Sequence, residues 1–223
     1  MTGAGNASGP GALRAKMFPV GSFSSNCYVA DCSETREAMV IDPGFVSEAE
    51  AADIFSYIED NGLKVRRVID THGHPDHTCG NSLVKERYGA PICVHEGDAH
   101  MLGESGWPTA RFFGFNCVSP AADVLLHDGD QVDFGNVSLK VLHCPGHSAG
   151  SIVLVGEGAV FSGDVLFAGS IGRTDFPGSS ERLMWGSLRK LLGLADSLVV
   201  YPGHGPASTL GVEKRVNPFL RGL

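Results

Sequence analysis

Four side chains that commonly bind metal ions lie within six residues of this sequence: His72, His74, Asp76 and His77. They follow the apolar run 65–69, so we expect them in the loop after a buried strand. His72 and His74 are two residues apart and can point the same way from an extended turn, whereas the adjacent Asp76 and His77 point differently. One loop can therefore hold two metal ions. Imidazole nitrogen and carboxylate oxygen suit zinc, iron(II) or manganese, and a loop that merely caps the next helix has no use for this density of ligands.

Three further residues of ligand type stand just beyond apolar strands in the second half of the chain: His147, Asp164 and His204. Each lies next to a glycine, which lets the backbone come close to a buried site. Sites in sheet-based folds gather at strand ends. A lone histidine or aspartate after a strand is usually a cap, but together with the first loop these residues predict a set of five histidines and two aspartates.

The segments that must position these residues alternate between the periods of strands and helices. We predict strands at 16–20, 27–30, 38–41, 65–69, 92–94, 124–126, 131–134, 137–142, 152–155, 159–162 and 198–201, and helices at 48–61, about 77–88 and 181–192, with a short amphipathic stretch at 209–219. Each half runs strands, then helix, then strand. This order predicts an α/β fold in which two sheets lie face to face with helices on both outer faces.

Composition restricts both the domain organisation and the class of protein. With 223 residues the chain is expected to form one domain, 16–223, after a Gly/Ala/Ser-rich disordered tail at 1–15. The net charge of −8 argues against a nucleic acid partner. No apolar run approaches the length that spans a membrane, so no membrane partner is expected. The sequence does not predict an oligomeric state.

The six cysteines are spread along the chain without CxxC pairs. The tail lacks the hydrophobic segment of a signal peptide. We therefore expect a cytoplasmic protein whose cysteines are reduced and mostly buried thiols.

The spacing His72-x-His74-x-Asp76-His77, followed by His147, Asp164 and His204, resembles the metallo-β-lactamase superfamily. The resemblance implies a four-layer αββα sandwich of two mixed sheets with two divalent metal ions between them. By position it implies that the first ion is bound by His72, His74 and His147. It implies that Asp76, His77 and His204 bind the second, with Asp164 as the bridging carboxylate. Zinc is the expected metal, with iron or manganese as alternatives.

Segments 169–178, 203–206 and 217–220 resemble the short glyoxalase II-like, or hydroxyacylglutathione hydrolase-like, hydrolases. That resemblance implies hydrolysis of a small-molecule thioester, S-lactoylglutathione or a related acyl thioester, by a hydroxide that bridges the metals. Asp76 and Asp164 are the carboxylates assigned to catalysis. A β-lactamase usually has Cys or Ser where this chain has Asp164, which argues against antibiotic hydrolysis.

The main alternative is a persulfide dioxygenase of the same fold, which uses one iron and molecular oxygen. Such enzymes tend to have Asp after the last histidine, where this chain has Gly205-Pro206, and this difference favours hydrolysis. Full-length glyoxalase II carries a helical C-terminal region that binds glutathione, whereas only residues 205–223 follow the last ligand here. We therefore expect weak saturation by S-lactoylglutathione.

Two features near the ligands have open interpretations. Arg173 is a candidate for binding an anionic group of the substrate, and an internal salt bridge with Asp175 is the alternative. The aromatic segment 103–120 shows little periodicity and fits a lid over a binding site or a packed surface loop equally well.

Overall fold

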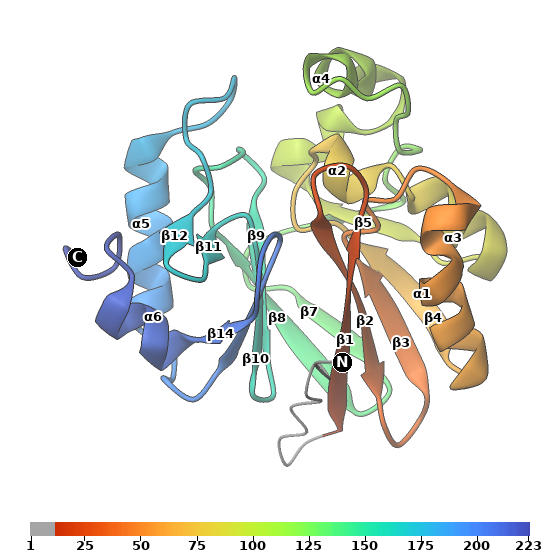
Figure 1. Cartoon of the computed structure of the whole chain (residues 1–223), viewed down its shortest axis with the longest axis horizontal. Coiled ribbons are helices and arrows are strands. Elements are labelled where there is room, and N and C mark those ends of the chain that lie inside the picture. Colours follow the sequence, from red (N-terminus) through yellow and green to blue (C-terminus); the bar gives the residue numbers. More distant parts are fainter. Residues whose placement is uncertain (1–11) are drawn as a thin grey trace.

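The computed structural model describes residues 12–223 and consists of two six-stranded β-sheets packed face to face, with helices on both outer faces (Figure 1). The first sheet has the order β1-β2-β3-β4-β5-β6, built from Leu13–Val20, Ser25–Cys32, Glu37–Ile41, Lys64–Ile69, Ile92–His95 and Val124–Leu126. Strands β1 to β3 form an antiparallel meander, and β3 to β6 are parallel. Helices α1 (Glu48–Asp60) and α3 (Asn81–Tyr88) lie on the outer side of this sheet.

The second sheet has the order β14-β13-β10-β9-β8-β7, built from Ser208–Thr209, Val199–Pro202, Ala159–Gly163, Ile152–Gly156, Val137–His143 and Gln131–Phe134. Its strands are antiparallel neighbours except β10 and β13, which are parallel. Helices α5 (Glu181–Leu192) and α6 (Leu210–Val216) cover its outer face (Figure 1). A small hairpin, β11 (Leu166–Phe167) and β12 (Ser170–Ile171), follows β10. The predicted four-layer αββα sandwich is confirmed.

Central strands are apolar on both faces, which is why each sheet packs on two sides. In β2, Tyr28 belongs to the core between the sheets, whereas the next residue, Val29, packs beneath α1. In β10, Phe161 lies between the sheets and Val160 packs beneath α5. The alternation therefore produces three apolar layers, one between the sheets and one under the helices on each side.

The helix predicted over about 77–88 is divided into α2 (Pro75–Thr78) and α3. The division occurs at Cys79 and Gly80, where the Gly80 N–H donates to the carbonyl of Pro43 at 2.7 Å. A Cβ at this glycine would collide with the ring of Phe45. The backbone of α2 is thus held against the loop after β3, and this contact positions Asp76 and His77.

The segment after β5 is more regular than its sequence suggests. It forms the 3₁₀ helices η1 (Glu96–Met101) and η2 (Gly103–Gly106) and the short helix α4 (Trp107–Phe112). Proline in the first turn of α4 is compatible with a helix start. Among the helices of residues 12–223, none combines the length and apolar character needed to cross a membrane.

Strand β1 begins before the predicted start of the domain. Leu13 is buried and pairs with Cys32, and the Arg14 guanidinium forms an ion pair with the carboxylate of Asp31. These contacts place residues 13–15 in the first sheet and not in a tail. Residues 1–11 of the predicted tail lie outside the described residues.

The prediction that all six cysteines are reduced is wrong for two of them. Cys79 and Cys117 form a disulfide, with Cα atoms 5.9 Å apart. The fold brings together two residues that are 38 positions apart, which no local sequence pattern reveals. Cys27, Cys32, Cys93 and Cys144 are free and buried, as expected. The expected cytoplasmic location, which rested partly on reduced cysteines, stays a prediction.

The packing between the sheets predicts a specific stability difference. Leu139 is fully buried in this layer, so Leu139→Ala should lower the free energy of unfolding by about 2–5 kcal/mol through lost burial and a cavity. Leu125→Ala on β6 is the matched control, because that side chain is 47% exposed, and its cost should stay within about 0.5 kcal/mol. Urea unfolding measures both variants. Equal losses at the two positions would contradict the core assignment.

Candidate metal centre

The seven predicted ligand side chains meet in one cluster, although they come from both sheets. His72 and His74 lie in the loop after β4, and Asp76 and His77 lie in α2. The second sheet contributes the turn between β8 and β9, the residue after β10 and the turn after β13, which carry His147, Asp164 and His204. Three overlapping groups of these residues have potential ligand atoms within 4.8 Å of one another. The first and second groups described below share no residue, and the third joins them through His72, His77 and Asp164.

The first group is His72, His74 and His147, and all three side chains are buried. The Nε2 atom of His147 lies 2.9 Å from Nδ1 of His74. The Nε2 atom of His72 is buried without a hydrogen-bond partner among the described residues. Three imidazole nitrogens directed at one another are the arrangement that a bound cation satisfies.

The second group is Asp76, His77 and His204. Nε2 of His77 lies 3.3 Å from Nε2 of His204 and 3.4 Å from Oδ2 of Asp76. Oδ2 of Asp76 is also 3.3 Å from Nε2 of His204. Two nitrogens and one carboxylate oxygen therefore converge on a second point.

Asp164 stands between the two groups. Its Oδ2 atom is 3.4 Å from Nε2 of His147 in the first group and 3.6 Å from Nε2 of His204 in the second. Its Oδ1 atom is 3.6 Å from Nε2 of His77 and has no hydrogen-bond partner among the described residues. A buried carboxylate with ligands of both groups around it fits the position of a bridge between two ions.

The outward ring nitrogens of His147 and His204 face backbone carbonyl oxygens, which can only accept a hydrogen bond. Nδ1 of His147 donates to the carbonyl of Arg173 at 2.9 Å, and Nδ1 of His204 donates to the carbonyl of Phe23 at 3.2 Å. Because a carbonyl cannot donate, each proton resides on Nδ1, and the Nε2 lone pair is left free toward the centre of the cluster. Such outer contacts fix the tautomer and orientation of metal-binding histidines.

Asp42 fixes the tautomers of two more ligands. Its Oδ2 accepts from Nδ1 of His77 at 3.1 Å and from Oγ1 of Thr71 at 2.7 Å. Since the Thr71 hydroxyl donates to Asp42, it accepts from Nδ1 of His72 at 3.2 Å. One carboxylate thus orients a histidine of each group. In the sequence, Asp42 belongs to an Asp-Pro-Gly turn after an apolar strand, a pattern that does not reveal these contacts.

Asp98 is a buried residue that the sequence analysis did not single out. Its carboxylate accepts hydrogen bonds from the Gly73 N–H at 2.9 Å, the Ser148 hydroxyl at 2.6 Å and the Gly150 N–H at 2.6 Å. Gly73 separates His72 from His74, and Ser148 follows His147, so Asp98 joins the two loops of the first group. An aspartate in a 3₁₀ helix after a strand carries no distinctive local signal.

Burial and neighbouring charge prepare these groups for metal binding. Burial lowers the pKa of His72 well below its ordinary value and that of His74 to about 3, so both imidazoles are neutral. Burial also opposes a charged His77, but Asp76, Asp164 and Asp42 outweigh it and raise the pKa of His77. A metal ion must therefore displace a proton from His77, and metal binding weakens as the pH falls through that raised pKa.

Arg173 has a clear structural role through its backbone, whose carbonyl accepts from His147. Its guanidinium forms two hydrogen bonds with the carboxylate of Asp175, at 2.9 and 2.8 Å, and lies over the ring of Phe176. The alternative salt bridge considered from the sequence is therefore present. A contact between Arg173 and an anionic substrate stays a prediction.

Residues 20–204 match the model of the metallo-beta-lactamase superfamily, a range that contains the whole ligand set. The hydroxyacylglutathione hydrolase GloC of Haemophilus influenzae is 35% identical over 217 residues, which cover 93% of this chain and 98% of that protein.

Solved structures share the fold over almost the entire chain. The B3 metallo-beta-lactamase BLEG-1 has a TM-score of 0.84 at 33% identity, covering 92% of this chain and 99% of that one. TTHA1623 in a di-iron-bound form has a TM-score of 0.80 at 34% identity, covering 92% and 100%. ETHE1 from Myxococcus xanthus has a TM-score of 0.76 at 28% identity, covering 93% and 84%.

The contacts of Asp98 predict that it supports the first ligand group without being a ligand. Asp98→Asn keeps the size of the side chain but turns an NH₂ group toward N–H and O–H donors. We expect metal affinity to fall about 10–100-fold, with the ion of the first group lost first. Elemental analysis after dialysis against a chelator measures this. Asp133→Asn on exposed β7 is the control, and full metal retention by Asp98→Asn would contradict the assignment.

Proposed function

This chain belongs to the metallo-beta-lactamase superfamily, and on that basis we propose that it is a dinuclear metal-dependent hydrolase that cleaves a thioester. The observation that carries the proposal is the arrangement of six ligand-type side chains in two groups of three, with Asp164, the seventh, between them. The similarity to GloC supports a substrate of the S-lactoylglutathione type or a related acyl thioester. The similarity to a di-iron-bound structure supports two divalent ions, with zinc as the expected metal and iron or manganese as alternatives.

In this proposal each group of residues holds one ion. His72, His74 and His147 would hold the first, and Asp76, His77 and His204 would hold the second. Asp164, which lies between the two groups, would serve both. The donor set fits borderline and hard divalent cations, because it contains nitrogen and oxygen but no thiolate.

When bound, two divalent ions supply a hydroxide near neutral pH and polarise a carbonyl, since coordination lowers the pKa of water to about 7. The chain's own residues fix this centre: Asp164 sets the separation of the two groups, and Asp42 holds one histidine of each. A thiolate leaves well without a proton, so hydrolysis of a thioester requires little help from an acidic side chain. The proposed binding partner of this site is its substrate, a small-molecule thioester.

A mono-iron persulfide dioxygenase is the second candidate. The similarity to ETHE1 is compatible with this alternative. The two candidates differ in the number of metal ions and in the need for molecular oxygen, and both differences can be measured directly.

The first prediction of this proposal concerns the metal content. Two complete ligand groups should hold two divalent ions per chain. Elemental analysis of protein purified without added metal measures the number, and an oxygen electrode with glutathione persulfide measures oxygen uptake. One iron per chain together with oxygen uptake would replace the hydrolase with the dioxygenase.

The second prediction concerns Asp164, which lies near ligands of both groups. Asp164→Ala should lower the rate of thioester hydrolysis at least about 100-fold, equivalent to about 2.7 kcal/mol, and should lower metal occupancy. Steady-state kinetics and elemental analysis measure the two effects. Asp133→Ala on the exposed face of β7 is the control and should match the parent protein. Full activity of the Asp164→Ala variant would contradict the site assignment.

A further inference from the structure

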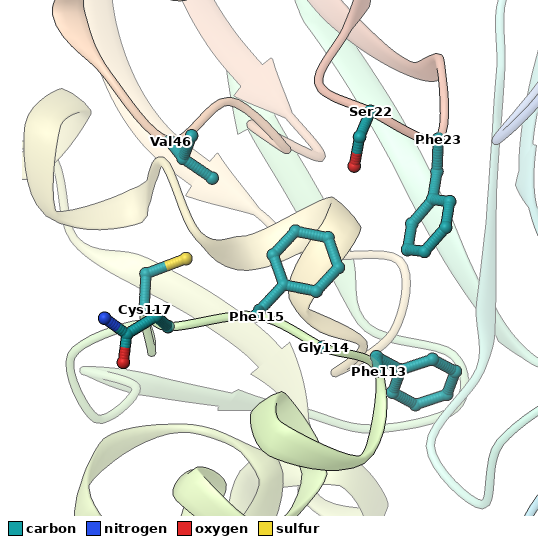
Figure 2. A pocket seen from close by; sticks show the side chains of 8 residues that line it. Ser22, Phe23, Val46, Phe113, Gly114, Phe115 and Cys117 are labelled. Carbon is teal, nitrogen blue, oxygen red and sulfur yellow. The ribbon is translucent and has the colours of Figure 1, made fainter.

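Beside the predicted metal ligands lies a pocket of about 470 Å³ (Figure 2). None of the seven predicted ligands lines it. Three segments that are distant along the chain form it: the turn after β1 with Ser22 and Phe23, the loop after β3 with Val46, and residues 113–117. Figure 2 shows Phe23, Val46 and Phe115 arranged around this space. The volume lies within the range of small-molecule sites.

Two of the residues that line the pocket contact predicted ligands, one from each metal group. The backbone carbonyl of Phe23 accepts the hydrogen bond from His204, and the ring of Phe113 lies 4.6 Å from the ring of His74. The rings of Phe23 and Phe115 are 5.5 Å apart and join the two walls. The pocket therefore lies one residue away from a predicted ligand of each group.

None of the residues that line the pocket has a charged side chain. The guanidinium of Arg173 is paired with Asp175, and that of Arg111 lies over the ring of Trp107. Burying the carboxylates and the ammonium group of glutathione in such a space without partners is costly. An uncharged aromatic or branched aliphatic group gains from burial there and from contact with the phenylalanine rings.

The wall formed by residues 113–117 is fixed relative to the metal ligands by the disulfide. Cys117 is bonded to Cys79, which is two residues after His77. At its other end the wall is joined to α4, because the Phe115 N–H donates to the carbonyl of Ala110 at 2.8 Å. The disulfide thus links this wall to the segment that follows Asp76 and His77.

We propose that this pocket binds the thiol half of the substrate and selects thioesters of uncharged, apolar thiols over glutathione thioesters. The inference rests on the proposed thioester hydrolysis. It assigns the acyl half to the metal centre and assigns specificity for the thiol to Phe23, Val46 and Phe115.

The test compares three thioesters with the same lactoyl group, made with benzyl thiol, N-acetylcysteamine and glutathione. The kcat/KM of the benzyl ester should exceed that of the glutathione ester at least about 10-fold. Phe115→Ala should lower kcat/KM for the benzyl ester at least about 10-fold and leave the N-acetylcysteamine ester within about threefold. A preference for the glutathione ester that Phe115→Ala does not change would overturn the proposal.

A second variant keeps the test decisive if Phe115→Ala does not fold. Val46 is 48% exposed, so Val46→Lys is tolerated sterically and adds a cation to the pocket. It should lower kcat/KM for the benzyl ester and raise it for the glutathione ester. Leu125→Ala, which changes a similarly exposed side chain on β6, should alter neither. If Val46→Lys changes kcat/KM for the benzyl and glutathione esters by the same factor, the assignment of the thiol half to this pocket is wrong.

Binding of an uncleavable probe separates failure of this inference from failure of the proposed reaction. Benzyl 2-hydroxyethyl thioether has the apolar group but no ester bond, and calorimetry measures its affinity. Binding to the parent protein with at least about 10-fold weaker binding to Val46→Lys supports the pocket even if no thioester is hydrolysed. Hydrolysis of all three esters without any binding of the probe rejects the pocket and leaves the reaction standing.

Discussion

The carboxylate of Asp42 is the constraint on which the metal centre depends, because it orients one histidine in each ligand group. It accepts from His77 directly and from His72 through the hydroxyl of Thr71. Since a carboxylate can only accept, the Nδ1 protons of His77 and His72 and the hydroxyl proton of Thr71 point away from the centre of the cluster. Asp42 adopts a left-handed backbone with φ of 52°, a conformation that a buried hydrogen-bond network can stabilise.

The cluster also depends on how the two sheets meet. Tyr28 and Asn26 of β2 donate to the carbonyl of Pro202, at 2.6 and 2.9 Å, and so attach the turn that carries His204 to the opposite sheet. At Gly203 a Cβ would collide with the carboxylate of Asp164, so only glycine permits this approach. The contacts that hold the sheets together therefore also position the ligands, which couples folding to metal binding.

The candidate metal centre and the pocket both involve the turn that contains Phe23, but no predicted ligand side chain lines the pocket. The turn that fixes His204 through the carbonyl of Phe23 presents the Phe23 ring to the pocket. The other wall, 113–117, contributes no ligand and is joined to the ligand loop by a disulfide. If this wall selects the thiol as proposed, substitutions on it would change the accepted thiol while the seven predicted ligands stay the same, as expected where loops on a rigid scaffold carry specificity.

The sequence by itself predicted the sandwich and the seven side chains that the fold gathers in one cluster, because both leave local patterns. Four ligands crowd one loop, single ligands beside glycines follow apolar strands, and strand and helix periods differ. Only the tertiary structure decided the roles of Asp98, the Cys79–Cys117 disulfide, the pairing of Arg173 with Asp175 and the lining of the pocket. Most of these features join residues far apart along the chain. Even for Arg173, which is two residues from Asp175, the sequence allowed either a substrate contact or the salt bridge. Their contacts depend on which loops the packed sheets bring together.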